Sequence, residues 1–430
     1  ASSPNSPFFG IRARSDPLPM LTGTNLQQAN SYNIRIVLET VRLHGPLSRI
    51  EISRRTRLTA QTVTNITKKL LAAGLIVEAE RLQEGRGAPS ILLRLNPDAA
   101  FSVGLDFDKD HLTGVLVDLS GRIRQRENLD LDFPSPEEAL SLMTRTVNRL
   151  IERENVDRSV VWGVGVGLPG PLIISEGSVV TNVANPKFLP GWNHVPVVEI
   201  LGRRLDLPVH LENNASAAAI GEKWYGEGRH SRTFFYLFFG AGLGGGLILN
   251  GEPYSGFSGN AGEIGYFPSP RLAQSTPNGD PIHSGIHFNL PRLMERLRSL
   301  GLPARSPLDL LTLFERREPH MMRWVEEAVD ELVPLVLGVE YLIDPEVIFF
   351  GGRIPERIIQ HILERLAERL PESRIPGKTT TPKLRKAESG PDAAALGVAT
   401  IPLYNSLAPL PSILMKTPQK FSRQLRMDGS

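Results

Sequence analysis

The sequence predicts an α/β protein in which an N-terminal winged helix precedes a body of two α/β lobes. Three observations predict this class. The chain has 430 residues, too many for one domain. Its first part reads as three helices and a hairpin, and strands then alternate with helices in two successive stretches. We expect the following organisation: a tail at 1–20, the winged helix at 21–96, a first lobe at 97–215 completed by 390–402, a second lobe at 216–389, and a C-terminal tail at 403–430.

Composition narrows the setting in which the protein works. Hydrophobic residues make up 41% of the chain, enough to fill a large core, and there is no cysteine to form a disulfide or a thiolate metal site. No apolar run is long enough to cross a membrane, and the N-terminus lacks the charged-then-apolar pattern of a signal peptide. We therefore expect a cytoplasmic protein without a membrane partner.

The stretch 45–77 predicts a helix-turn-helix. Ser48 is placed to cap a short first helix, and Thr59 to cap a second helix at 60–73, which Gly74 then ends. Apolar residues recur at helical spacing and are expected to form the buried stripe: Leu58, Val63, Ile66, Leu70 and Leu71.

The other face of the second helix is suited to DNA. Small polar groups gather near its start and two lysines follow, an order that fits base edges and then phosphates. The candidate DNA-binding residues of this helix and its cap are Thr59, Gln61, Thr62, Thr64, Asn65, Lys68 and Lys69. An ordinary helical hairpin with a solvated basic face is the alternative.

The flanking segments favour DNA binding over that alternative. A long helix is expected at 25–44, and strands at 75–80 and 91–95 form a hairpin. Arg86 lies between two glycines at the hairpin tip, a shape that can lower a guanidinium into a minor groove. Between residues 31 and 94 there are eleven Lys and Arg against five Asp and Glu, whereas the whole chain carries only +2. The expected partner is double-stranded DNA.

After residue 96 apolar strands alternate with amphipathic helices. The first lobe is expected to hold strands at 101–105, 112–119, 122–132, 160–167 and 209–211, and helices at 136–154, 195–205 and 215–225. The next segment is expected to hold strands at 233–239, 246–249 and 347–350 around a glycine loop at 240–245, and helices at 289–299, 307–317, 320–342, 355–370 and 392–402. In such α/β architectures ligands bind beyond the carboxyl ends of the strands.

Four ordered motifs resemble those of the ROK family of repressors, open reading frames and sugar kinases. They are GLPGP at 167–171, NPKFLPGW at 185–192, LENNASAAAIGE at 211–222 and GAGLGGGLILNGEPYSGFSGNAGEIGYF at 240–267. The resemblance runs from about residue 21 to 402. It implies a sugar-kinase-like body of the actin and ribonuclease H type. It also implies sugar-responsive transcriptional repression, because the family's kinases lack the DNA-binding domain.

The motifs depart from those of the family's kinases where phosphoryl transfer needs them. The kinases have an Asp after the Asn that matches Asn213, whereas this chain has Asn214, whose carboxamide cannot accept the hydroxyl proton. Their first phosphate loop is Asp-x-Gly-Gly-Thr, and the matching stretch 106–110, Asp-Phe-Asp-Lys-Asp, has no glycine. In the second loop Ala241 replaces a hydroxyl residue. We predict no catalytic residue and no cofactor, and interpret the glycine loop as a tight turn with positive φ and close strand packing.

The resemblance still places a sugar site between the lobes. Sugars are bound by planar polar groups that pair with adjacent hydroxyls. The residues at matching positions are Asn185, Asn213, Asn214, Glu263 and Tyr266, with the chain at Gly170 passing close to the ligand. Two alternatives stay open: the paired asparagines cap the helix that follows them, and Glu263 is a solvated loop carboxylate.

One departure concerns metal. The family usually has a His where Tyr266 stands, and that His both binds sugar and ligates a zinc held by a following cysteine cluster. Because this chain has no cysteine, we predict no metal. His283 and His287 are four residues apart, but we interpret them as surface or structural residues. The loop 268–288 must then be held by packing or stay mobile.

These expectations combine into a sugar-responsive repressor of transcription. It would be a homodimer or homotetramer that binds operator DNA and takes a sugar or sugar derivative as effector. One alternative is an active ATP-dependent sugar kinase fused to a DNA-binding head. The other is a DNA binder that responds to no ligand, or whose body docks another protein.

Overall fold

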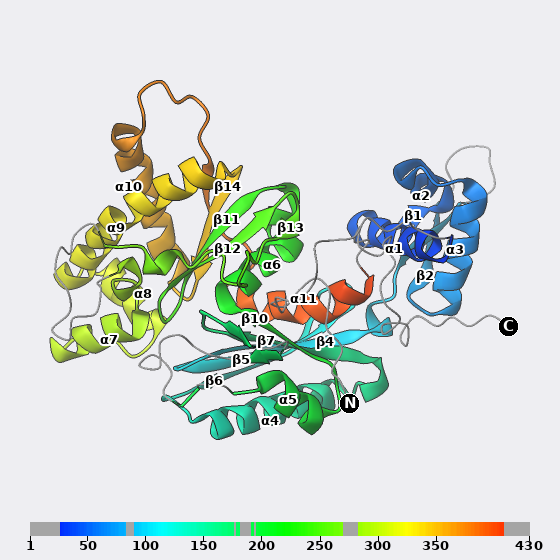
Figure 1. The fold of residues 1–430 in the computed structure, drawn as a ribbon, viewed down its shortest axis with the longest axis horizontal. Coiled ribbons are helices and arrows are strands. Elements are labelled where there is room, and N and C mark those ends of the chain that lie inside the picture. The colour runs from blue at the N-terminus through cyan, green and yellow to red at the C-terminus, as the bar shows by residue number, and fades with distance from the viewer. Residues whose placement is uncertain are drawn as a thin grey trace.

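A computed structural model describes residues 26–82, 90–175, 178–180, 191–192, 195–269 and 283–407 (Figure 1). Within them, three sheets of three or more strands organise the chain. We call the parts built on these sheets the head, the first lobe and the second lobe, in chain order. The predicted α/β class is confirmed.

The head spans residues 26–95. Its helices are α1 (Leu26–His44), α2 (Arg49–Thr56) and α3 (Ala60–Ala72), and its strands are β1 (Leu47–Ser48), β2 (Ile76–Leu82) and β3 (Ser90–Leu95). The strands form an antiparallel sheet in the order β1-β3-β2, of which the sequence analysis missed β1. Ser48 caps α2 in a capping box with Glu51, and Thr59 caps α3. The head thus contains three helices followed by a hairpin, as the sequence predicts.

The first lobe is a five-stranded sheet in the order β10-β7-β4-β5-β6. Its strands are β4 (Phe101–Asp108), β5 (His111–Asp118), β6 (Ile123–Asp130), β7 (Val161–Leu168) and β10 (Val209–Asn213). Two helices, α4 (Pro136–Glu154) and α5 (Val197–Leu205), share a buried core with one face of this sheet. A short hairpin of β8 (Ile173–Ser175) and β9 (Ser178–Val180) follows β7 and was not expected. Because β4, β7 and β10 are parallel, their carboxyl ends meet at one edge.

The second lobe is a five-stranded sheet in the order β13-β12-β11-β14-β15. Its strands are β11 (Phe234–Phe239), β12 (Leu243–Leu249), β13 (Glu252–Pro253), β14 (Val347–Gly352) and β15 (Lys383–Lys386). Its outer helices are α7 (Leu290–Ser299), α8 (Pro307–Glu315), α9 (Pro319–Ile343) and α10 (Glu356–Ser373), whose apolar residues join one face of the sheet in a single core. Two short edge strands, β13 and β15, were not predicted from the sequence.

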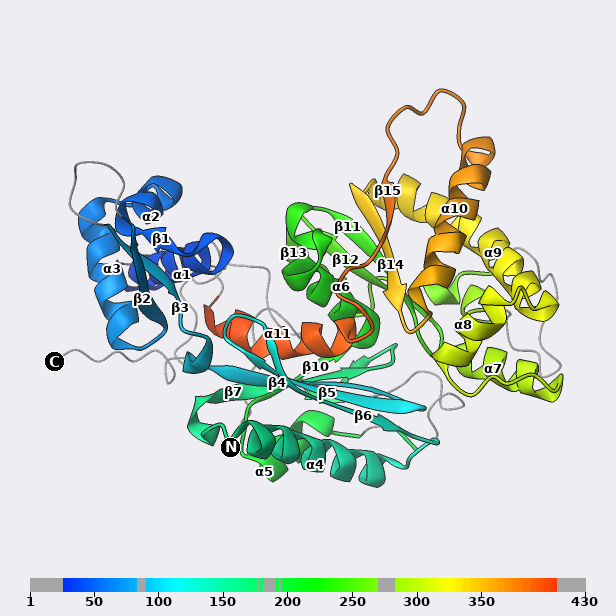
Figure 2. The same ribbon diagram turned by 180° about the vertical axis from the view of Figure 1, so that it is seen from behind.

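Two helices lie between the two large sheets, α6 (Asn214–Tyr225) and α11 (Ala393–Leu407) (Figure 2). Their backbones approach closely, because a Cβ added to Gly397 would lie 1.7 Å from the carbonyl oxygen of Ala217. A Cβ on Gly104 in β4 would likewise lie 1.9 Å from the carbonyl oxygen of Ala395 in α11. The small residues of both helices therefore allow one helix pair to serve as core for both lobes.

The head shares a hydrophobic core with the body. Val37 and Val41 of α1 belong to the same buried cluster as Leu119, Ala399 and Leu403. Helix α11 reaches Leu407 and passes through Pro402, whereas we predicted its end at 402. The missed turn contains Leu403 and Leu407, which pack into this cluster, and that packing offsets the hydrogen bond that proline cannot make.

The glycine-rich stretch differs from its prediction. Gly244 and Gly245 lie inside β12 rather than in a loop, and no glycine from 240 to 246 has a φ in the left-handed region. The expectation of positive φ was therefore wrong. Close packing is the reason for glycine here, because a Cβ on Gly246 would lie 2.4 Å from the carbonyl oxygen of Ala215 in α6.

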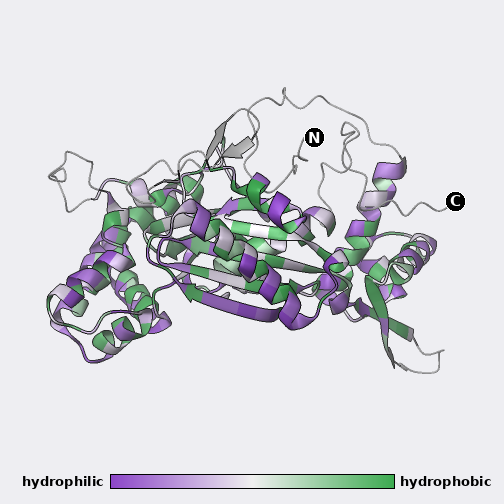
Figure 3. Ribbon diagram, turned by 90° about the horizontal axis from the view of Figure 1, so that it is seen from below, coloured by the Kyte–Doolittle hydropathy of each residue, from purple (hydrophilic) through white to green (hydrophobic). Residues whose placement is uncertain are grey.

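Hydropathy follows these layers. Figure 3 shows hydrophobic residues concentrated on the strands in the middle of the body, whereas the helices in front carry many hydrophilic residues. No helix in the described ranges combines the length and the apolar character that crossing a bilayer requires.

Candidate functional site

The outer face of α3 presents the polar residues expected to contact DNA. Gln61, Asn65, Lys68 and Lys69 are exposed, and Thr59 is exposed at the cap. The Gln61 amide donates to Asn65 Oδ1 over 3.2 Å, so these two amides are held side by side. Two further residues of the predicted set, Thr62 and Thr64, are half-buried and bonded within the helix to Thr59 and to the carbonyl of Ala60, respectively.

Additional positive charge flanks this face. Arg54 and Arg55 are exposed at the end of α2, and Arg57 in the following turn adopts a left-handed conformation with φ 58°. Arg54 and Arg55 were predicted in the first helix and Arg57 in the turn, and none of the three was predicted to contact DNA. The predicted contact at Arg86 lies outside the described residues.

The carboxyl ends of the parallel strands bring three predicted sugar-site residues together. The Asn213 side chain, at the end of β10, donates from Nδ2 to Glu263 Oε1 over 3.1 Å. A Cβ on Gly170, just beyond β7, would lie 2.2 Å from both of those atoms. The prediction that the backbone passes close to the site at Gly170 therefore has a geometric basis. Another predicted member, Asn185, lies outside the described residues.

The alternative reading of Asn213 as a helix cap also holds. Its Oδ1 accepts from the N–H groups of Ala215 and Ser216, at 2.7 and 3.4 Å. One side chain thus caps α6 with its oxygen and turns its amide nitrogen toward Glu263.

Asn214 points to the other side of the same strand end. Its Nδ2 donates to the carbonyl oxygen of Phe107 over 3.1 Å, and the residue is 4% exposed. Its Oδ1 is buried and has no hydrogen-bond partner in the described part of the chain. A Cβ on Gly167 of β7 would lie 2.8 Å from this oxygen, so the oxygen is packed against the neighbouring strand.

A residue that the sequence analysis missed joins the two lobes beside this site. Asn260 accepts from the N–H of Leu172 over 2.7 Å and donates to the carbonyl of the same residue over 2.8 Å. Its signal was its position inside the longest ROK-like motif, three residues before Glu263. The pair of bonds fixes the second-lobe loop that carries Glu263 onto the segment that follows Gly170.

Burial changes the acidity of two carboxyl groups here. Burial raises the pKa of Glu263 to about 7. Burial likewise raises the pKa of Glu212 to about 7, although its Oε1 accepts from the N–H of Asn213 over 2.9 Å. Tyr266 is 45% exposed, and burial together with the charge of Glu263 raises its pKa. The alternative reading of Glu263 as a solvated loop carboxylate is not supported, because its Oε1 accepts from Asn213 and the side chain is partly buried.

The loop beyond Tyr266 is anchored by a buried carboxylate. Glu331 in α9 accepts from Ser269 over 2.5 Å and from Ser284 over 3.0 Å, which fixes the chain on either side of residues 270–282. His283 is bonded to the carbonyl of Gly265 at 2.8 Å, whereas His287 stacks on Trp324 with ring centroids 5.6 Å apart. Both histidines thus contact other residues of the fold. In the described ranges no group of three or more His, Asp or Glu is placed to hold a metal ion.

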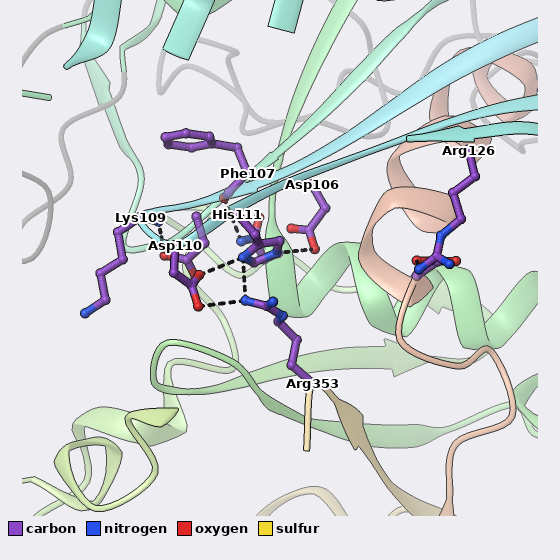
Figure 4. Close-up of polar contacts among 10 residues, drawn as sticks. Asp106, Phe107, Lys109, Asp110, His111, Arg126 and Arg353 are labelled. Carbon is purple, nitrogen blue, oxygen red and sulfur yellow. Dashed lines mark hydrogen bonds and ion pairs between the residues drawn. The ribbon is translucent and has the colours of Figure 1, made fainter. Parts of the chain in front are cut away.

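The stretch that matches the first phosphate loop is occupied by charged side chains of the protein itself (Figure 4). It forms the end of β4 and a tight turn into β5, and Asp106, Asp108 and Lys109 are buried there. Arg353, which follows β14 of the other lobe, donates to Asp110 Oδ2 over 2.7 Å. His111 lies between Asp110, at 2.7 Å, and Asp106, at 3.4 Å.

Burial and neighbouring charges shift the pKa values of His111, Asp110 and Asp108 in different directions. Burial opposes it, but hydrogen bonds with Asp106 and Asp110 raise the pKa of His111 to about 9. Against the effect of burial, His111 and Arg353 lower the pKa of Asp110 to about 2. Burial and the charge of Asp110 raise the pKa of Asp108 to about 6. His111 Nδ1 lies 2.7 Å from Asp110 Oδ1 and 2.8 Å from Arg353 Nη1, so His111 and Arg353 meet at Asp110.

Comparison with known proteins shows which family and which relatives this chain resembles. Residues 102–403 match the ROK family model. A xylose repressor of Caldicellulosiruptor bescii is 31% identical over 244 residues, which cover 56% of this chain and 59% of that protein. An N-acetyl-D-glucosamine kinase of Citrobacter koseri is 27% identical over 281 residues, which cover 63% of this chain and 90% of the kinase. The chain thus spans somewhat more than half the length of the xylose repressor.

One solved structure covers nearly the whole fold. A ROK family transcriptional regulator, described as a homologue of the E. coli MLC protein, superposes with a TM-score of 0.69 at 22% identity, over 90% of this chain and 99% of the other. At this identity the likeness shows the fold, head and body together. With seven-tenths of its sequence matched by one family model, this chain belongs to the ROK family.

Proposed function

We propose that this chain is a sugar-responsive, DNA-binding regulator of transcription that acts as a repressor. The observation that carries the proposal is the joining of a winged helix to a ROK body through one hydrophobic core. Such a junction gives a ligand between the lobes a physical route to the DNA-binding face.

The geometry of α3 supports the DNA contact. Exposed Gln61 and Asn65 are suited to read base edges, and Lys68 and Lys69 to contact phosphate. We propose the same contact for Thr59, Thr62, Thr64 and Arg86, the last on sequence alone.

The strand-end geometry supports a sugar as effector. Asn213 and Glu263 supply a donor and an acceptor next to one another, and Gly170 leaves room beside them. We propose Asn214, the residue after Asn213, as a further contact. Tyr266 and Asn185 complete the proposed set. Xylose is the first sugar to test, because it is named for several relatives.

We also propose that the chain does not phosphorylate its sugar. The position of the expected base holds Asn214, and Asp110 and Arg353 pair where the first phosphate loop would receive an anion. We keep the remaining expectations as proposals: the domain boundaries at 20, 96, 215 and 389, a cytoplasmic location, and a dimer or tetramer that binds a palindromic operator.

The test uses full-length protein and an operator selected by it from random duplexes. We expect xylose to weaken operator binding in fluorescence anisotropy by about 5- to 150-fold, the usual range of allosteric coupling. The Glu263→Ala and Gly170→Ala variants should bind the operator as the natural chain does but lose the response. Asn213→Ala is less informative, because it also removes the cap of α6.

Gly242→Ala is the matched control for Gly170→Ala, because nothing lies within 4 Å of a Cβ at position 242. It should keep the full response. If neither xylose, glucose nor N-acetylglucosamine alters binding or melting temperature, the sugar part of the proposal is wrong. If no duplex is selected, the DNA part is wrong.

The kinase alternative rests on the kinases among the relatives, one of which matches over 90% of its own length. A coupled assay of ADP release with the same three sugars and ATP distinguishes it. We expect no sugar-dependent release, and steady turnover would replace the repressor by a kinase with a DNA-binding head.

A further inference from the structure

A direct ionic contact bridges the two lobes at the strand ends. Asp110 belongs to the turn between β4 and β5 in the first lobe, and Arg353 follows β14 in the second, 243 residues later. Arg353 Nη1 lies 2.7 Å from Asp110 Oδ2, and the two side chains are only 22% and 24% exposed. A pair this sheltered from water is screened less than a surface pair.

Other residues of each lobe fix the positions of Asp110 and Arg353. His111 contacts Asp110 at 2.7 Å and is itself contacted by Asp106, so the carboxylate is oriented before Arg353 reaches it. On the other side, the backbone N–H of Arg353 donates to the carbonyl of Phe239 over 2.7 Å, which fixes the arginine to the end of β11. The contact therefore joins two rigid sheet edges rather than two mobile side chains.

The contact between Asp110 and Arg353 lies on the same edge of the first-lobe sheet as the proposed sugar-site residues. In the first-lobe sheet, β4 lies next to β7, and β7 lies next to β10. The ionic contact is at the end of β4, whereas Gly170 follows β7 and Asn213 ends β10. Any rotation that parts Arg353 from Asp110 also tends to part Glu263 of the second lobe from Asn213 of the first.

We propose that Asp110, His111 and Arg353 form an interlobe latch that positions the second lobe, and with it Glu263, before any ligand arrives. The latch acts together with the bonds of Asn260 to Leu172 to set the lobe separation of the ligand-free protein. Its effect on ligand affinity rests on the proposed sugar site, but its effect on lobe separation does not.

The test measures lobe separation in ligand-free full-length protein. Because the chain has no cysteine, Arg145→Cys in α4 and Glu295→Cys in α7, both at exposed positions, give two unique sites for spin labels. Pulsed electron paramagnetic resonance then reports the distance between the lobes. The latched protein should give one narrow distance distribution. Arg353→Gln should add a population at longer distance, with the open-to-closed ratio raised about five-fold or more.

Two comparisons identify the cause. Arg353→Lys keeps the charge and should restore most of the narrow distribution. Arg365→Gln removes an ion pair with Glu326 that lies wholly within the second lobe, and should leave the distribution unchanged. Identical distributions for Arg353→Gln and the parent would overturn the latch, as would equal broadening by Arg365→Gln.

A melting-temperature screen of the parent protein with xylose, glucose and N-acetylglucosamine separates this proposal from the proposed function. A narrow distance that broadens in Arg353→Gln supports the latch even if none of these sugars binds. If a sugar does bind, Arg353→Gln should weaken it about five-fold without altering the contacts of Asn213.

Discussion

At the scale of single residues, β10, which ends at the candidate site, contains a buried acid, Glu212. Glu212 is 1% exposed, and burial raises its pKa from 4.5 to about 7. In the unfolded chain this carboxyl ionises first as pH rises. The contribution of Glu212 to the free energy of unfolding is therefore fully present below about pH 4.5 and is lost as the pH rises through about 7.

We expect Glu212→Gln to remove this dependence. The amide keeps an oxygen that can accept from the N–H of Asn213 but carries no charge to bury. Between pH 5 and 8, the free energy of unfolding of the natural chain should fall by on the order of 3 kcal/mol more than that of the variant. Urea unfolding at four pH values measures this, with Glu364→Gln, an exposed substitution, as control. If the free energies of unfolding of the natural chain and of Glu212→Gln change in parallel with pH, ionisation of Glu212 does not destabilise the folded protein.

Single residues also show where sequence reasoning reaches its limit. Asn213 was assigned both as a cap and as a site residue, and each role leaves a local signature in the sequence. The pairing of Asp110 with Arg353 leaves none, because it depends on how two sheets face each other across 243 residues. Asn260 was missed for the same reason, since its partner Leu172 is 88 residues away.

At the scale of elements, α3 illustrates what the sequence predicts well. Its cap, its buried stripe and its polar face all follow from local rules, and the structure reproduces the cap at Thr59 and the buried Val63, Ile66 and Leu70. Elements whose bounds depend on contacts with distant parts of the chain were predicted less well. Gly244 and Gly245 of β12 were assigned to a loop, because the residues that pack on them, Ala215 of α6 and Gly262, are distant in the sequence.

Lys68 allows the role of α3 to be measured. If it contacts phosphate, Lys68→Ala should weaken binding to all duplexes similarly and lower the slope of log affinity against log salt by about one unit. Anisotropy titrations between low and moderate salt give the slope. Arg316→Ala, which removes the same charge from an exposed position in the body, should leave it unchanged. An unaltered slope in Lys68→Ala would place this lysine outside the interface.

At the scale of the whole molecule, α6 connects the candidate site to the head. Its N-terminus is capped by Asn213, and near its other end Trp224 lies under the guanidinium of Arg42 in α1, 3.9 Å from ring centre to Cζ. Tyr225 also bonds to Thr400 of α11 over 2.8 Å. A small movement of the cap can therefore reach the head through one rigid helix.

We expect Trp224→Ala to uncouple the two sites. Sugar and operator should each still bind, but the factor by which sugar weakens operator binding should fall toward one. By linkage, the factor by which the operator weakens sugar binding must fall equally. Titrations of each ligand with and without the other measure both factors. Tyr341→Ala, an exposed aromatic far along the chain in α9, is the control. An undiminished factor in Trp224→Ala would assign the coupling to another route.

The anchoring of residues 269 and 284 to one carboxylate has a consequence for how the protein can be altered. Glu331 accepts from both serines, so one carboxylate holds the chain beside Tyr266 and the chain beside His283. Substitution of Glu331 therefore releases both segments at once, whereas substitution of Ser269 or Ser284 releases only one.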